Sequence, residues 1–206
     1  LTSCLVNPGA CSEKEFSYDP VPKKIKNIAV VGSGPAGLAA SITARNRGFK
    51  VSLFEIKDKI GGQLNLASKI PGKEEFLGLL EYYKNEILRL GINLYLDYNV
   101  TISELRLFDE VIIATGVTPR DVKFHITDRS NVVSYIDILN GNFVAGKNVA
   151  ILGAGGIGFD VAQFLVTDKM SSTLNLSKWL EEWGVADPEL FRGGVQIPRL
   201  KTREPN

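Results

Sequence analysis

The sequence predicts an α/β fold, because short apolar segments rich in β-branched residues alternate with helical patterns, and two of these segments lead directly into glycine-rich turns. The turns are GSGPAG at residues 32–37 and GAGGIG at residues 153–158, and their first glycines are 121 residues apart. A strand, a glycine-rich turn and a helix in this order are typical of a Rossmann-like nucleotide-binding unit. We therefore expect one Rossmann-like unit and the start of a second.

The first unit is complete in the sequence. Residues 28–31 predict an apolar strand, and Pro35 suits the first position of the helix that follows the turn, because its missing N–H would have no partner there. Gly48 ends this helix, and residues 50–54 predict a second strand with Glu55 at its end. A single glycine turn also occurs in ordinary α/β proteins, but here every part of a βαβ unit follows in order.

Four residues of this unit indicate a dinucleotide ligand. Gly32 permits the tight turn, Gly34 lets the backbone approach a pyrophosphate, and Gly37 lets the helix pack closely on the strand. The phosphates would lie at the helix N-terminus, where N–H groups are free. Glu55, 21 residues after Gly34, is placed to accept hydrogen bonds from a ribose diol, and a carboxylate there would repel a 2′-phosphate. The predicted ligand of this unit is therefore FAD or NAD rather than NADP.

The second unit is incomplete in the sequence. Residues 148–152 predict a third apolar strand, and a helix follows the turn. Gly153, Gly155 and Gly158 repeat the glycine positions of the first turn. The position 21 residues after Gly155 is Leu176, so no residue that reads a ribose stands there. Two dinucleotide sites in one chain suggest that hydride passes from a nicotinamide to a flavin.

The segments between the two turns are expected to supply packing elements and two loops close to a cofactor. Gly62 permits another close backbone approach and Gln63 offers an amide, although a simple turn would explain both. Thr115 and Gly116 follow a strand expected to be buried, and they let the chain pass close to a cofactor. The other expected elements are a helix at 74–90 closed by Gly91, strands at 92–96, 99–102 and 109–114, and helical turns at 134–139 closed by Gly141. Residues 170–198 are expected to be an insertion, in which Trp179 and Trp183 share a helix closed by Gly184.

The composition excludes several classes of function. Of the 206 residues 44% are hydrophobic, and 24 Lys and Arg balance 23 Asp and Glu, so no net field would attract nucleic acid or anionic lipid. No apolar run approaches the length of a membrane span. Cys4 and Cys11 lie too near one end to form a disulfide framework, which predicts a reducing cytoplasm. His125 is the only histidine, and no nucleophile motif accompanies it.

Residues 1–26 are expected to be an irregular lead-in, because three prolines interrupt them. The first residue is Leu1 rather than Met, and no signal peptide is recognisable, so the sequence is expected to be a piece of a longer polypeptide. We expect domains at residues 27–146 and 147–206.

The motifs together resemble those of the two-dinucleotide flavoprotein disulfide reductases, and more closely the C-terminal half of bacterial 2,4-dienoyl-CoA reductase. That family contains iron–sulfur flavoenzymes of the old yellow enzyme superfamily. The resemblance covers essentially the whole chain. It rests on GSGPAG with Glu55, GGQ, ATG and GAGGIG in this order, and on the stretches CLVNPGAC, GGQLNLASKIPGKEEF, FDEVIIATGVTPR, VAILGAGGIGFDVA and EEWGV.

The resemblance implies an FAD-binding domain at residues 27–146 that lacks a C-terminal return segment, and a partial NAD(P)-binding domain at residues 147–206. It implies that residues 1–26 lead in from an N-terminal TIM barrel with FMN, and that Cys4 is the last of four ligands of a 4Fe–4S cluster. Cys11 is not expected to bind the cluster. One cysteine cannot hold a cluster, so the isolated chain should lack it.

The resemblance also assigns residues to the cofactors. It places Ala36 at the pyrophosphate of FAD, Glu55 at the adenosine ribose and the backbone of Val100 at the adenine, with Gln63 and Lys73 nearby. The second turn would hold the pyrophosphate of NADPH, and the residues that read its phosphate are expected outside this sequence. The complete expected set is Gly32, Gly34, Pro35, Ala36, Gly37, Glu55, Gly62, Gln63, Lys73, Val100, Thr115, Gly116, Gly153, Gly155 and Gly158.

The activity implied by the resemblance is a reductase in which NADPH reduces FAD, and electrons pass through the cluster near Cys4 to FMN. FMN would then deliver hydride to an enoyl-CoA substrate of fatty acid β-oxidation. No residue of this chain is expected to act as a general acid or base, and the sequence does not predict an oligomeric state. The alternatives are a 2-enoate reductase or an amine dehydrogenase of the same architecture, a nucleotide-binding module without catalysis, and an α/β domain without a ligand.

Overall fold

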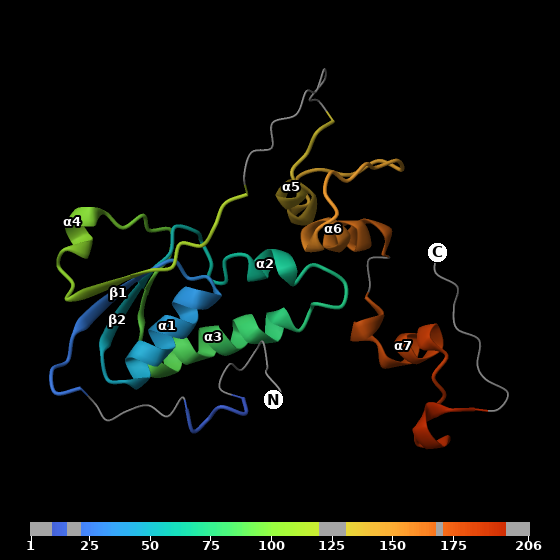
Figure 1. Ribbon diagram of the computed structural model, residues 1–206, viewed down its shortest axis with the longest axis horizontal. Coiled ribbons are helices and arrows are strands. Elements are labelled where there is room, and N and C mark those ends of the chain that lie inside the picture. The colour runs from blue at the N-terminus through green and yellow to red at the C-terminus, as the bar shows by residue number, and fades with distance from the viewer. Residues whose placement is uncertain (1–9, 16–21, 120–130, 168–170, 197–206) are drawn as a thin grey trace. The chain divides into compact units, whose positions relative to one another are not determined.

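The computed structural model describes residues 10–15, 22–119, 131–167 and 171–196 of the chain (Figure 1). The chain forms two compact units, one from residues 1–68 with 74–132 and the other from residues 69–73 with 133–206. The chain therefore leaves the first unit after Ser68 and returns to it at Glu74. The predicted domain boundaries at residues 26 and 146 stay predictions.

A four-stranded parallel sheet forms the centre of the first unit, with strand order β3-β2-β1-β4, and it confirms the predicted α/β fold. In the register, Val30 pairs with Leu53 on one side and with Ile112 on the other. Parallel pairing puts the carboxyl ends of β1, β2 and β4 at one edge of the sheet, where ligands bind in folds of this type. The strands are β1 (Asn27–Val31), β2 (Lys50–Phe54), β3 (Asn93–Tyr95) and β4 (Glu110–Ile113).

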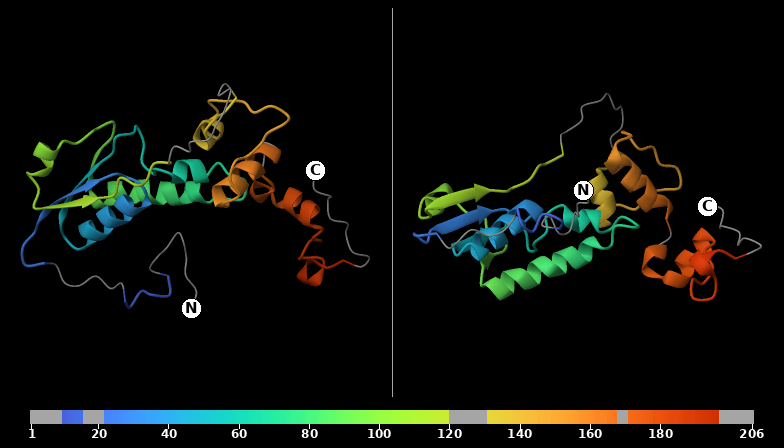
Figure 2. Two further views of the ribbon diagram at one scale, coloured as in Figure 1. Left: turned by 45° about the horizontal axis from the view of Figure 1, so that its top comes forward. Right: turned by 60° about the horizontal axis from the view of Figure 1, so that its bottom comes forward.

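Two helices pack on one face of this sheet (Figures 1 and 2). Helix α1 (Pro35–Asn46) connects β1 to β2, and α3 (Phe76–Leu90) lies beside it. Val30, Leu38 and Leu53 are completely buried between the sheet and α1. Each side chain of this size contributes roughly 1.5–3 kcal/mol by leaving water. The predicted apolar face of α3 reaches the same core through Leu79, Tyr83 and Ile87.

Three helices end at the glycines that were predicted to close them. Gly91, Gly141 and Gly184 end α3, α5 and α7 in the left-handed conformation, with φ of 63°, 74° and 62°. In the second unit α5 packs against α6. The short helices are α2 (Leu64–Ala67), α4 (Ile102–Leu105), α5 (Tyr135–Asn140), α6 (Gly156–Val166) and α7 (Leu176–Trp183), and single 3-10 turns lie at Ser172–Leu174 and Arg192–Gly194.

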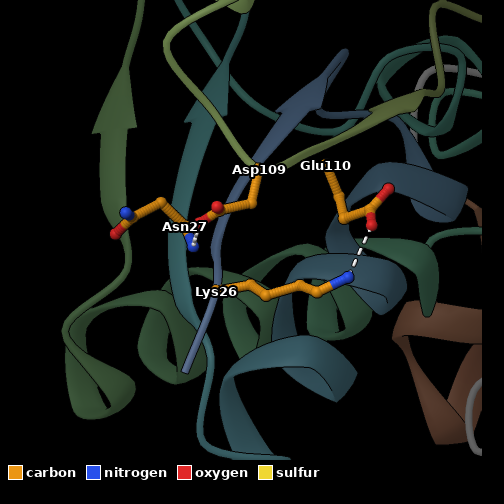
Figure 3. A network of polar contacts seen from close by, with 4 residues as sticks. All are labelled: Lys26, Asn27, Asp109 and Glu110. Atoms are coloured by element: carbon orange, nitrogen blue, oxygen red, sulfur yellow. Dashed lines mark hydrogen bonds and ion pairs between the residues drawn. The ribbon is translucent and has the colours of Figure 1, made fainter. Parts of the chain in front are cut away.

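A group of polar contacts joins the start of β1 to the start of β4 (Figure 3). The Nζ of Lys26 lies 2.6 Å from Oε1 of Glu110, and this partner raises the pKa of Lys26. The N–H of Asn27 donates to Oδ2 of Asp109 at 2.8 Å, and the N–H of Asp109 donates to the carbonyl of Asn27 at 2.9 Å. These contacts fix the register in which β4 joins β1.

The predicted strand at residues 99–102 is wrong. Thr101 instead caps α4: its Oγ1 accepts a hydrogen bond from the N–H of Glu104, and the Glu104 carboxylate accepts one from the N–H of Thr101. This reciprocal pair is a capping box, which starts a helix and excludes a strand.

Two further expectations about strands are also wrong. The strand at 109–114 forms as β4, but it is not buried: it lies at the edge of the sheet that the described residues form, and its Ile113 is 66% exposed. Residues 148–152 have no strand structure, since no partner strand lies beside them among the described residues. Val149 and Ile151 instead line a hollow with Ala162 of α6.

None of the helices in the described ranges is long and apolar enough to cross a membrane. The described residues also contain no group of three or more His, Cys, Asp and Glu side chains that could hold a metal ion. Cys4 and His125 lie outside the described residues. The role predicted for Cys4 as a cluster ligand therefore stays a prediction.

Candidate dinucleotide-binding site

Backbone carbonyl groups pack closely against two glycines of the first turn. Gly32 has φ of +100°, and a Cβ there would lie 2.4 Å from the carbonyl oxygen of Ala114, beyond the end of β4. A Cβ on Gly37 would lie 1.8 Å from the carbonyl oxygen of Gly32. A Cβ on Gly34, in contrast, would meet no atom within 4 Å. Two glycines are thus required by packing, whereas Gly34 leaves open space in front of the helix.

The second turn has a similar backbone geometry, although a Cβ on Gly153, unlike one on Gly32, would meet no atom within 4 Å. Gly153 has φ of +120°, and a Cβ on Gly158 would lie 2.2 Å from the carbonyl oxygen of Gly153. A Cβ on Gly155 would again meet no atom within 4 Å. Gly34 and Gly155 are both extended, with ψ of 178° and −179°. The two motifs therefore fold alike although the segment before the second one is not a strand.

The helices that follow the two turns begin without a side-chain cap. Their N-cap residues, Gly34 and Gly155, have no side chain that could accept from the first N–H groups, and neither first turn contains an acidic residue. The side chains of Thr101, Ser134 and Asn175 cap α4, α5 and α7, whereas α2 and α3 also begin without a side-chain cap. What sets α1 and α6 apart is that each begins behind an extended glycine, Gly34 or Gly155. Free N–H groups and the positive end of the helix dipole suit a phosphate. The turns therefore fit the pyrophosphate of a dinucleotide.

Glu55 follows β2 and is 7% exposed. Its Oε2 accepts hydrogen bonds from the N–H of Ser33 at 2.8 Å and from Oγ of Ser33 at 2.7 Å. Its Oε1 accepts from the N–H of Lys57 at 2.9 Å. Oε2 thus accepts two of these hydrogen bonds and Oε1 one, so Oε1 is the oxygen that could accept from a ribose hydroxyl.

The same hydrogen bonds set the charge of Glu55. Burial by itself would raise the pKa of Glu55, because it disfavours the charged form. The hydroxyl and N–H of Ser33 and the N–H groups of Lys57 and Ile56 outweigh burial, so the pKa of Glu55 lies below its ordinary value of 4.5. Glu55 is therefore an anion at neutral pH, which favours an unmodified ribose over one with a 2′-phosphate.

The predicted loop residues Gly62 and Gln63 lie next to the first turn. The N–H of Gly61 donates to the carbonyl of Ser33 at 2.8 Å, and a Cβ on Gly62 would lie 3.1 Å from Cα of Gly34. The amide of Gln63 donates to the carbonyl of Val117 at 3.1 Å, and so contacts the segment that begins with Thr115 and Gly116. The structure therefore brings both predicted loops to the edge of the sheet that carries the turn.

The other residues predicted for the first site are Lys73 and Val100. Lys73 belongs to the second unit, where its Nζ lies 2.7 Å from both carboxylate oxygens of Asp160 on α6. Val100 is half-buried and directly precedes the cap of α4. Leu176, at the position of a ribose reader in the second unit, is the exposed first residue of α7.

Sequence reasoning missed Ser33, although it lies inside the first glycine motif. The sequence signal that could have identified it is the residue type, because the hydroxyl of a serine between two glycines can donate to a carboxylate at the end of the neighbouring strand. Glu55 is 22 residues away in the chain, and only the pairing of β1 with β2 brings the two together.

The parallel sheet, the two turns and Glu55 define an α/β domain of the dinucleotide-binding class. The sequence profile of the pyridine nucleotide-disulphide oxidoreductase family matches residues 26–174. The chain belongs to this family, whose cofactors are FAD and NAD(P)H.

Individual relatives agree with this family. A metal reductase from Desulforamulus reducens is 34% identical over 200 residues, which are 94% of this chain and 30% of the relative. A cinnamate reductase from Clostridium sporogenes is 32% identical over 165 residues, which are 79% of this chain and 24% of the relative. The solved complex of 2-naphthoyl-CoA reductase with 2-naphthoyl-CoA superposes with a TM-score of 0.73 and 32% identity, over 80% of this chain and 25% of that chain. The chain thus spans less than a third of these relatives.

Proposed function

We propose that this chain is the FAD- and NAD(P)H-binding part of a flavin-dependent reductase of the enoate and CoA-ester type, and in particular of a 2,4-dienoyl-CoA reductase. Its work is to bind and orient two dinucleotides, and FAD supplies the group that the nicotinamide reduces. In the intact enzyme, reducing equivalents would pass on through a 4Fe–4S cluster, with Cys4 as one ligand, to FMN. An enoyl-CoA substrate would be reduced there, outside this chain, in the cytoplasm.

The observation that carries the proposal is the repetition of one turn geometry in a single chain. Both turns offer an uncapped helix N-terminus behind an open glycine, Gly34 in one and Gly155 in the other. A module that only binds a nucleotide needs one such site, whereas electron transfer between cofactors needs two. Among the described residues, a buried carboxylate, Glu55, contacts the first turn and none contacts the second, which supports FAD at the first turn and NAD(P)H at the second.

The residues of the first unit have separate roles in this proposal. The pyrophosphate of FAD would lie at the N-terminus of α1, beside Gly34 and Ala36, and Glu55 would accept hydrogen bonds from the adenosine ribose. Gly62 keeps the neighbouring loop close to the turn, and Gln63 anchors the segment around Gly116. The names of two relatives, for cinnamate and for 2-naphthoyl-CoA, support an unsaturated carboxylate or CoA thioester as the substrate.

The test is anaerobic reduction of the intact protein. We expect purified protein to retain FAD, its flavin absorbance to bleach on addition of NADPH, and 2,4-dienoyl-CoA to be consumed. Glu55→Ala should weaken FAD binding by at least about tenfold, since a hydrogen bond to a charged group is worth about 1.5–3 kcal/mol. The matched control is Glu81→Gln on α3, whose side chain is 64% exposed, and it should bind FAD normally.

Each alternative predicts a different result in the same experiment. A 2-enoate reductase would consume the free acid and not the thioester. An amine dehydrogenase would have its flavin reduced by an amine and not by NADPH. A binding module would retain FAD that no donor reduces. Retention of FAD by Glu55→Ala with unchanged affinity would contradict the role of Glu55.

A further inference from the structure

We propose that Ser33 is a positioning residue for Glu55: it holds one carboxylate oxygen against the turn and so presents the other to the adenosine ribose. Ser33 thereby sets the preference of the first unit for a ribose with a free 2′-hydroxyl. This inference rests on the proposed function, in which the first turn binds a dinucleotide.

Every polar group of Ser33 has a partner. Its N–H and Oγ donate to the same oxygen of Glu55, Oε2, at 2.8 and 2.7 Å, and its carbonyl accepts from the N–H of Gly61 at 2.8 Å. Ser33 is completely buried. The side chain therefore has one orientation, and it joins the turn, the end of β2 and the glycine loop at one point.

The two oxygens of Glu55 are held differently. Oε2 receives both donors of Ser33, which fill the two acceptor positions of one carboxylate oxygen. Oε1 receives its hydrogen bond from the N–H of Lys57. Without the hydroxyl, Oε2 would regain a free position and the carboxylate could rotate. A ribose hydroxyl would then meet a less ordered acceptor, which weakens binding.

The second turn supports this reading because it lacks both partners. Ala154 occupies the position that corresponds to Ser33, and its methyl group cannot donate a hydrogen bond. Leu176, which has the same spacing from Gly155 as Glu55 has from Gly34, is exposed at the start of α7. The two turns otherwise share their geometry. Among the described residues, the hydroxyl is therefore present at the turn that contacts a buried carboxylate, and the other turn has neither.

Ser41 provides a matched control within the same unit. It lies on α1, is completely buried like Ser33, and its Oγ has no hydrogen-bond partner among the described residues. Ser33→Ala and Ser41→Ala remove the same atom from equally buried positions. Only the first change breaks a contact with Glu55.

The experiment measures binding of ADP and 2′-deoxy-ADP to FAD-stripped intact protein by calorimetry. The wild type should prefer ADP. Ser33→Ala should weaken ADP binding about five- to tenfold and change 2′-deoxy-ADP binding less than twofold, since the lost contact acts through the bond to the 2′-hydroxyl. Ser41→Ala should leave both affinities unchanged. In a Glu55→Gln background, Ser33→Ala should have no further effect on the preference.

The outcomes separate the two proposals. Equal weakening of both ligands by Ser33→Ala, or full additivity with Glu55→Gln, would show that Ser33 acts only on folding and would overturn the inference. An unchanged preference in Ser33→Ala would overturn it as well. If the wild type bound neither ADP nor FAD, the proposed function itself would fail.

Discussion

The carbonyl oxygen of Gly32 occupies the place where a side chain on Gly37 would begin. The distance from that oxygen to a Cβ at Gly37 would be 1.8 Å, less than any contact between such atoms in real structures. Helix α1 thus approaches its own turn as closely as two backbones can. In the second turn, a Cβ on Gly158 would lie 2.2 Å from the carbonyl oxygen of Gly153. The last glycine of each motif is needed for this contact rather than for a special backbone angle.

Gly37→Ala should therefore destabilise the protein. The added methyl group must displace α1 from the turn, and overpacking of this kind costs about 2 kcal/mol or more in the free energy of unfolding. Gly78→Ala on α3 is the matched control, because a Cβ there meets nothing within 4 Å. It should stabilise the helix by about 0.5–1 kcal/mol. Urea denaturation of the two variants measures both effects, and equal stability would contradict the close contact.

The stability of the protein should fall in acid partly because of Glu55. Burial opposes its ionisation, but the hydroxyl and N–H of Ser33 and the N–H groups of Lys57 and Ile56 prevail and lower the pKa of Glu55 below 4.5. The unfolded chain then takes up the proton more readily than the folded chain, so the contribution of Glu55 is complete above about pH 5 and is lost as the pH falls through the folded pKa. Glu55→Gln removes this dependence.

The comparison that measures this effect is the difference between wild type and Glu55→Gln. Glu86, Glu104 and Asp137 also have lowered pKa values, so wild type alone would report their sum. We expect the stability advantage of the wild type at neutral pH to shrink below about pH 4.5. A difference that is constant from neutral pH to acid would show that the hydrogen bonds do not favour the ionised form.

The ion pair of Lys73 with Asp160 should hold residues 69–73 in the second unit. Asp160→Asn should speed hydrogen exchange of these residues and cost less than about 1 kcal/mol in stability, because the side chains of both partners are partly exposed. Glu81→Gln, which weakens an exposed pair at 4.0 Å from Lys84, should leave that exchange unchanged. Unaltered exchange in Asp160→Asn would mean that Lys69, through Leu139 and Asn140, is sufficient.

Local patterns predicted most elements of the first unit. The turn glycines, Pro35 and Gly91 stand where the structure begins or ends α1 and α3. The prediction of a strand at residues 99–102 was wrong, although the sequence contained the signal for a helix start, since Thr101 and Glu104 have the spacing of a capping box. The apolar residues of that segment suggested a strand, but the cap decides the conformation.

Expectations that depend on neighbours were less successful. An apolar run shows that a segment can be buried, but not whether another strand pairs with it, as the outcomes at residues 109–114 and 148–152 demonstrate. Glycine spacing and the position of Glu55 indicated a candidate site, yet its contact with Ser33 joins residues far apart in the chain. The partner of Lys73, 87 residues away, was unpredictable for the same reason.

The path of the chain between the units means that no single cut separates them. The chain enters the second unit at Lys69, leaves it after Lys73 and enters it again at Val133. A nick just before Val133 would leave Lys73 on one fragment and its partner Asp160 on the other. Each fragment would then carry part of the second unit. Truncation at one point therefore cannot isolate the second glycine turn with all the contacts of its unit.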